Sequence, residues 1–195
     1  MFYRLILLML AGLLSLVACS GTATPPVLAT DEDLPTQEVE MSFELSTPAF
    51  QPGAPIPKDY TCRGRGVSPE LNWGDPPAGT QSFALIMDDP DAPSGTFVHW
   101  VIFNIPAETG SLPENVPKVD ELPSGSRQGR NDFRKIGYGG PCPPPGKPHR
   151  YFFKLYALDR SLDLKPGASK QEVEKAMQGH TLEKAEQMGR YQRQQ

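Results

Sequence analysis

Positive charge is scarce in this chain of 195 residues, which has 19 Lys and Arg against 23 Asp and Glu and a formal net charge of −4. A mildly acidic protein has no general attraction for nucleic acid or for an anionic surface, so any anion site must be local. Histidine and cysteine are also rare, with three residues of each. The HExxH and CxxC spacings of common zinc sites do not occur. The composition therefore argues against a nucleic-acid-binding surface and does not support a zinc enzyme.

Long apolar runs are missing after the first 18 residues, so no transmembrane helix is predicted there. Those 18 residues hold the run LILLMLAGLLSLVA with Arg4 as the only charged side chain, a pattern typical of a signal peptide. The run ends in LVAC, which resembles a bacterial lipobox and implies cleavage before Cys19 and attachment of lipid, such as palmitate, to that residue. The alternative is a plain secretory signal followed by a chance cysteine. We expect a lipoprotein anchored to a membrane of the bacterial cell envelope, outside the cytoplasm.

The segment after the signal has a composition that cannot build a core. Residues 20–40 lack aromatic side chains and contain five acids and three prolines, which is typical of a disordered tether. The predicted organisation is a signal peptide at 1–18, lipidated Cys19 and its tether at 19–40, and one folded domain at 41–195.

Two cysteines remain in the predicted domain, Cys62 and Cys142. In an exported protein two thiols usually form a bridge. The bridge would close a loop of 142 − 62 = 80 residues, worth on the order of 4 kcal/mol in the chain-entropy description. The alternative is a pair of buried free thiols.

Short apolar runs bounded by Pro and Gly indicate a mainly β fold. The strongest predicted strands are FALIMDD, TFVHWVIFNIP and HRYFFKLYALD, preceded by an alternating segment from Met41 to Leu45. Only the last 27 residues favour helix. Ser169 and Glu172 have the spacing of a capping box, and Gly179 can end this helix. Leu182, Ala185 and Met188 indicate a second short helix, so the predicted fold is a sandwich-like sheet pair with C-terminal helices.

Two histidines stand on otherwise apolar strand faces. Side chains alternate along a strand, so His99 shares a face with Val101 and Phe103, and His149 shares a face with Tyr151. If these strands are neighbours, His99, His149 and Tyr151 line one pocket. A lone histidine of this kind is more often a satisfied core residue, but two of them beside Pro/Gly loops weaken that interpretation.

Two loops are placed to complete such a pocket. GYGGPCPPPG, residues 137–146, would form a stiff wall, because proline has no N–H and favours extended backbone. DPDAP begins with Asp89 and Asp91, which would point the same way if the backbone is extended. A carboxylate beside an imidazole fixes its tautomer. The alternative for this pair is a solvated Asx turn.

Several separate motifs resemble the phosphatidylethanolamine-binding protein family in its bacterial Raf-kinase-inhibitor-like branch. They are DDPDAPSGTFVHWVIFNIP, GYGGPCPPPGKPHRYFFKLYALD, YTCRGRGVSPELNW, GRNDF and the GASKQEVEKAMQGHTLEKAEQMGRYQR ending. The resemblance implies a β-sandwich with a large central sheet, a smaller sheet and a small anion pocket, and it makes His99 the neighbour of Asp89. Matched by motif, the implied ligand-binding residues are Asp89, Asp91, His99, Gly140, Pro141, His149 and Tyr151.

The function predicted from these features is non-catalytic binding of a phosphate-type anion or phospholipid head group, with no cofactor and no metal. One alternative is inhibition or modulation of a protein partner, kinase-like or protease, through the Pro-rich loops. Another is a hydrolase acting on phosphoesters, in which His99, His149 and Asp89 would hold a metal or exchange protons.

Overall fold

The computed structural model describes residues 43–194. The predicted signal peptide, the lipidation site at Cys19 and the predicted tether lie outside these residues. Within them, no helix is both long and apolar enough to cross a membrane. The elements in chain order are β1 (Leu45–Ser46), the 3-10 helix η1 (Lys58–Tyr60), β2 (Leu71–Trp73), β3 (Ser82–Asp89), β4 (Phe97–Pro106), β5 (Ser111–Leu112), β6 (Arg127–Gln128), β7 (His149–Leu158), α1 (Lys170–Met177) and β8 (Thr181–Tyr191).

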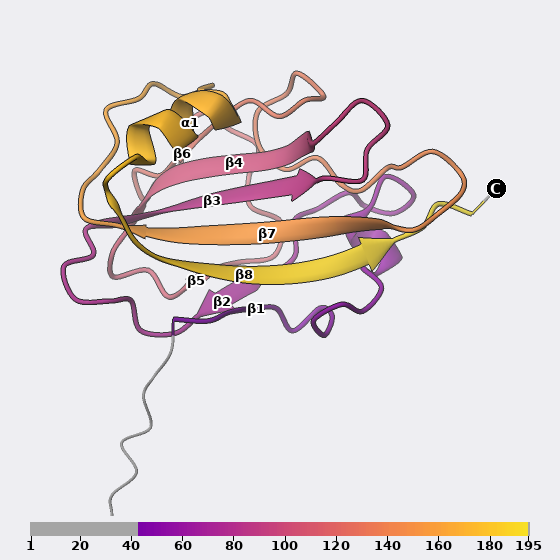
Figure 1. Cartoon of the computed structure of the whole chain (residues 1–195), viewed down its shortest axis with the longest axis horizontal. Helices are drawn as coiled ribbons and strands as arrows, with labels where there is room; N and C mark the ends of the chain where they lie inside the picture. Colours follow the sequence, from indigo (N-terminus) through magenta and orange to yellow (C-terminus); the bar gives the residue numbers. More distant parts are fainter. Residues whose placement is uncertain (1–42, 195) are drawn as a thin grey trace, which may run out of the picture. The chain divides into compact units, whose positions relative to one another are not determined.

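Two antiparallel sheets and one helix form the layers of the domain (Figure 1), which confirms the predicted mainly β fold. The large sheet has the strand order β6-β4-β3-β7-β8, and the small sheet has the order β1-β2-β5. An inner core between the sheets contains Leu71 and Trp73 of the small sheet and Phe83, Leu85 and Met87 of β3. An outer core lies between the large sheet and α1 and contains Ala84, Ile86, Val101, Phe103, Val173 and Met177.

Strand β3 lies at the centre of the large sheet and is buried along its whole length. This explains its continuous apolar run, because a central strand covered on both faces needs no polar alternation. The side chains of its last two residues still point to opposite faces of the sheet. Asp88 lies on the helix side, where its carboxylate contacts Lys154 at 2.8 Å and also Lys170 of α1. Asp89 therefore lies on the side of the inner core, at the end of the strand.

Strand β4 departs from simple alternation at His99. The pairing of β3 with β4 shifts register between residues 87 and 88, which leaves His99 as the extra residue of a β-bulge. Trp100 packs in the inner core, whereas Val101 and Phe103 pack in the outer core. The ring of His99 contacts inner-core Tyr151, so the predicted common face of His99, Val101 and Phe103 is wrong. A bulge changes the face of every residue beyond it.

The C-terminal prediction is half right. The first helix is present as α1. Both hydrogen bonds of the capping box between Ser169 and Glu172 are formed. The predicted second helix is wrong, because that segment is β8, which pairs with β7 over nearly its whole length. Its buried residues alternate strictly at Ala185, Gln187 and Gly189. The helix-forming composition of this segment was overridden by cross-strand pairing, which no local pattern encodes.

Candidate functional site

A cavity of about 410 Å³ opens where three strands of the large sheet bring polar side chains together. Asp89 is the last residue of β3, His99 lies near the start of β4, and His149 and Tyr151 lie at the start of β7. The two histidine strands are not direct neighbours, because β3 lies between them. Asp89 thus comes between the two imidazole-bearing strands, and the structure brings together four of the seven residues named from sequence.

Asp89 holds the imidazole of His149. The Nδ1 atom of His149 lies 2.8 Å from Oδ2 of Asp89, and both side chains are almost completely buried. Because a carboxylate oxygen accepts, His149 donates through Nδ1 and its Nε2 is left for another partner. The other oxygen of Asp89 accepts the backbone N–H of Asp91 at 2.9 Å, which makes an Asx turn. The imidazole neighbour of Asp89 is therefore His149, not His99 as implied by the resemblance.

His99 is held by backbone and by aromatic rings. Its Nδ1 lies 2.7 Å from the carbonyl oxygen of Gly139, so that Nδ1 carries the proton and Nε2 is the unprotonated nitrogen of the neutral ring. The rings of Phe97, Phe133 and Tyr151 surround it at centroid distances of 5.1, 5.4 and 5.2 Å. Burial lowers the pKa of His99, because the charged form loses solvation among these rings.

Tyr151 contributes a buried hydroxyl to the same cavity. The residue is fully buried, and its oxygen makes no hydrogen bond of normal length among residues 43–194; the Asp89 carboxylate interacts with the hydroxyl only weakly, from beyond that distance. Burial, reinforced by the charge of Asp89, raises the pKa of Tyr151, so the phenol keeps its proton. A buried hydroxyl without a partner is costly, and a ligand oxygen in the cavity would remove that cost.

Asp91 lies outside the cavity lining, contrary to the prediction. Its carboxylate is clamped by Arg150, whose Nε and Nη2 donate to it at 2.9 and 2.7 Å, while the Arg150 backbone N–H adds a third bond of 2.9 Å. Hydrogen bonding to Arg150 lowers the pKa of Asp91 to about 2. The residue therefore ties the DPDAP turn to β7 and does not orient either imidazole.

Gly140 and Pro141 do not line this cavity. A Cβ on Gly140 would stand 2.7 Å from the carbonyl oxygen of Tyr60, and the Pro141 carbonyl accepts the N–H of Cys62 at 3.1 Å. The two residues thus pack the loop against the segment after η1. The cavity wall comes from the next residues, Cys142, Pro143 and Pro144.

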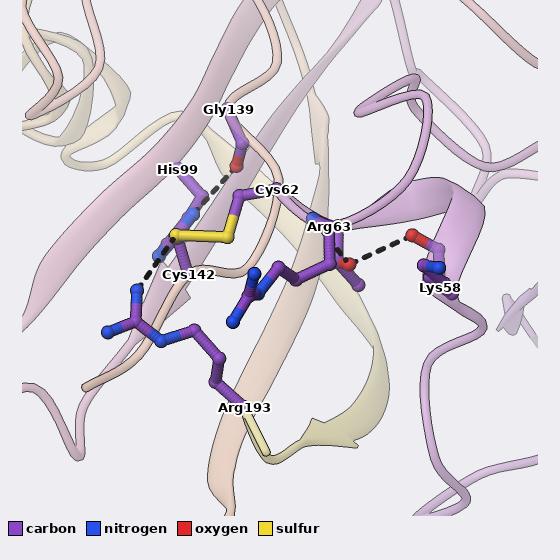
Figure 2. Close-up of a disulfide and its surroundings, with 8 residues drawn as sticks. Lys58, Cys62, Arg63, His99, Gly139, Cys142 and Arg193 are labelled. Atoms are coloured by element: carbon purple, nitrogen blue, oxygen red, sulfur yellow. Dashed lines mark hydrogen bonds between the residues drawn. A yellow bond between two sulfur atoms is a disulfide. The ribbon is translucent and has the colours of Figure 1, made fainter. Parts of the chain in front are cut away.

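The predicted cysteine pair lies at the same wall. The two sulfur atoms of Cys62 and Cys142 are 2.11 Å apart, which is a disulfide distance (Figure 2). The Cα atoms are separated by 5.4 Å, in the range that a bridge requires. A bond here would join the loop after η1 to the Pro-rich loop.

Several lining residues were missed from sequence. Asp132 and Phe133, from the GRNDF motif, line the cavity, and Oδ2 of Asp132 accepts the backbone N–H of Val98 at 2.7 Å. The motif carried the family resemblance, but nothing in its composition assigned it to the site. The rest of the rim is residues 92–96 of the turn between β3 and β4, together with Phe97 at the start of β4.

The metal alternative finds no geometric support in the part of the chain that the structure describes. No three His, Cys, Asp or Glu side chains within residues 43–194 are grouped closely enough to hold a metal ion. The Nδ1 of each cavity histidine is already engaged, one by a carboxylate and one by a carbonyl.

Comparisons with known proteins agree with the fold. Residues 46–192 match the family model of phosphatidylethanolamine-binding protein. The chain is 56% identical over 151 residues to a UPF0098 protein of Methanothermobacter thermautotrophicus, covering 77% of this chain and 99% of that one. It is 55% identical over 153 residues to a UPF0098 protein of Aquifex aeolicus, covering 77% and 89% of the two chains.

Solved structures give the same result. A Chlamydia trachomatis protein described as a phosphatidylethanolamine-binding protein homologue superimposes with a TM-score of 0.72 at 38% identity, covering 78% of this chain and 99% of that one. Escherichia coli YbcL, described as a member of the mammalian family of these proteins, gives a TM-score of 0.73 at 35% identity, with the same coverage. The chain belongs to the phosphatidylethanolamine-binding protein family.

Proposed function

We propose that this protein binds a phosphate-type anion, such as a free phosphate or a phospholipid head group, in the cavity formed by Asp89, His99, His149 and Tyr151. The observation that carries the proposal is the buried Tyr151 hydroxyl, which makes no hydrogen bond of normal length within residues 43–194 and only a weak contact with Asp89. A phosphate oxygen is a strong acceptor and would satisfy it. The name of the family supports the same ligand class.

The Asp89–His149 pair supports anion binding despite the negative charge of Asp89. The carboxylate accepts the N–H of Nδ1 of His149, so Nε2 of the same ring is left to face an anion in the cavity. His99 is different, because burial lowers its pKa. An anion bound beside the His99 ring raises the pKa of that imidazole, so that binding takes up a proton and affinity rises as the pH falls.

The cavity supports binding without catalysis. Besides the Tyr151 phenol, the hydroxyl side chains in its lining belong to Ser94 and Thr96, and within residues 43–194 none of the three makes a hydrogen bond to a histidine. An activated nucleophile needs such a base within reach. The lining therefore offers donors for an anion but no assembled pair of nucleophile and base. Incubation with a phosphoester, followed by a phosphate-release assay, tests this directly, and turnover that is lost with His149→Ala would favour the hydrolase alternative.

Calorimetry with phosphate and phosphoethanolamine tests the binding proposal. His149→Ala should weaken binding roughly 10- to 100-fold, because a hydrogen bond to a charged group contributes about 1.5–3 kcal/mol. His180→Ala is the matched control, since its imidazole bonds to Asp159 at 2.9 Å and does not line the cavity. Equal affinity of wild type and His149→Ala, or equal loss in both variants, contradicts the assignment.

We also infer that the domain acts at a membrane of the cell envelope, held there by lipid on Cys19. The support comes from the sequence of residues 1–19, and the experiment is the mass of the mature protein. Cleavage before Cys19 with added acyl mass is expected, and a Cys19→Ala variant should remain soluble or unprocessed. An unmodified mature N-terminus at another residue would contradict the inference.

A further inference from the structure

A second hollow of about 470 Å³ lies beside the end of β8. It is lined by Lys58 and Arg63, from η1 and the loop that follows it, and by the C-terminal residues Tyr191, Gln192 and Gln194. Its lining contains two cations, two amides and a phenol, and no carboxylate. This is unusual in a chain whose formal net charge is −4.

Arg193 is a third cation, adjacent in the chain to the lining residues Gln192 and Gln194, and its side chain reaches Cys142 at the wall of the first cavity. Its Nη1 lies 3.9 Å from Sγ of Cys142, and its Nε is buried without a hydrogen-bond partner among the described residues. Figure 2 shows the Arg63 and Arg193 side chains beside the disulfide, with both guanidinium groups on the same side of it in this view. A buried guanidinium N–H without an acceptor is costly, and an oxyanion is the acceptor that guanidinium favours.

The acids of this region are already engaged elsewhere. Arg65 pairs with Asp59 at 3.2 Å and with Glu114 at 2.8 Å. Glu114 also accepts a hydrogen bond of 2.9 Å from the hydroxyl of Tyr60. Within residues 43–194, neither Lys58 nor Arg63 nor Arg193 forms a salt bridge. The positive charge at the hollow is therefore not neutralised by the part of the protein that the structure describes.

The chemistry of this group matches a phosphate-type oxyanion. Guanidinium groups present planar forks of donors, and a lysine ammonium adds a mobile point charge. Cations brought together in this way repel one another, and a bound anion relieves that repulsion. We propose that Lys58, Arg63 and Arg193 form a second anion site, separate from the cavity around His149, that binds a phosphate-type oxyanion, either free or on a phospholipid head group.

Titration with inorganic phosphate, followed by backbone NMR, tests the second site apart from the first. The experiment uses the His149→Ala protein, in which the cavity is impaired. Saturable shifts are expected for the amides of residues 62–64 and 191–194. The further change Arg63→Gln should weaken this binding about tenfold or more, and adding Arg193→Gln should abolish it. Arg130→Gln is the control with the same change in charge, because Arg130 is exposed and outside this hollow.

A second experiment shows whether the anion is free phosphate or a phospholipid head group. Sedimentation with phosphatidylcholine vesicles, with and without phosphatidylglycerol, measures binding to lipid head groups. If the site takes head groups, Arg63→Gln lowers binding to the phosphatidylglycerol vesicles while Arg130→Gln does not. If it takes free phosphate, the NMR response is lost in Arg63→Gln while vesicle binding stays unchanged.

Two results would overturn the proposal. One is the absence of saturable shifts at both segments. The other is an equal response in the Arg63→Gln and Arg130→Gln proteins. Arg63 is exposed, so its substitution should not disturb folding even if Arg193→Gln does. Failure of the cavity at His149 would leave the Arg63 outcomes readable, because Arg63 lines only the second hollow and the two hollows share no lining residue. Arg193 contacts Cys142 of the first cavity's wall, so its variant is compared only with the Arg63→Gln protein.

Discussion

Replacing Tyr151 by Phe should separate stability from binding. The substitution removes one oxygen from a residue that is fully buried and whose hydroxyl has no hydrogen-bond partner within residues 43–194. The ring and its contacts, including the edge contact with His99 at 5.2 Å, are retained. The change therefore tests the hydroxyl alone.

The magnitude follows from the cost of an unpaired polar group. A buried hydroxyl without a partner costs about 1–3 kcal/mol, so Tyr151→Phe should leave the free energy of unfolding unchanged or raise it by about 1 kcal/mol. The affinity for the anion should fall. Loss of one donor to a charged oxygen costs about 1.5–3 kcal/mol, which is roughly a 10- to 100-fold weaker Kd.

Tyr138→Phe is the matched control. Tyr138 is equally buried, but its hydroxyl donates to the carbonyl oxygen of Tyr60 at 2.6 Å. The variant should lose about 1 kcal/mol of stability, because it leaves that carbonyl unpaired. Its anion affinity should not change, since Tyr138 does not line the cavity with the two histidines.

Urea denaturation and calorimetry with phosphate give both quantities on the same samples. The expected pattern is a stable Tyr151→Phe protein that binds weakly and a weakened Tyr138→Phe protein that binds normally. A loss of more than about 1 kcal/mol in Tyr151→Phe would show that the hydroxyl has a protein partner in solution. Unchanged affinity would show that it does not touch the anion, and either result refutes the reasoning.

Further predictions concern the disulfide, the buried carboxylate and the response to pH. If Cys62 and Cys142 are bridged, the unreduced, unfolded protein has no free thiol at either position, and reduction lowers stability by about 4 kcal/mol for a separation of 80 residues. Asp88→Asn should cost about 3–5 kcal/mol in urea, because it leaves two lysines without their buried counter-ion; a loss below about 1 kcal/mol would contradict that role. Burial lowers the pKa of His99, so the unfolded chain takes up this proton first and stability should decline as the pH falls below about 6.5. The pKa of Asp91 is about 2, so its contribution should persist down to about pH 4 and be lost between pH 4 and pH 2, and Asp91→Asn should remove that part of the acid titration.

Much of the fold could be predicted from local sequence patterns. The apolar runs predicted β3, β4 and β7, and the capping box predicted α1, because burial on both faces and helix capping leave direct marks in sequence. Alternation correctly grouped His149 with Tyr151, since β7 has no bulge before its last residues.

What the chain alone determined is thus the family, the strands β3, β4 and β7 with the helix α1, and the polar residues that these strands carry. Tertiary structure decided which of them meet. The bulge at His99 turned its ring toward Tyr151, and pairing with β7 made a strand of β8. Asp89 bonds to His149 because β3 lies between the two histidine strands. Each outcome depends on register and strand order, which are set by contacts between segments far apart in the chain.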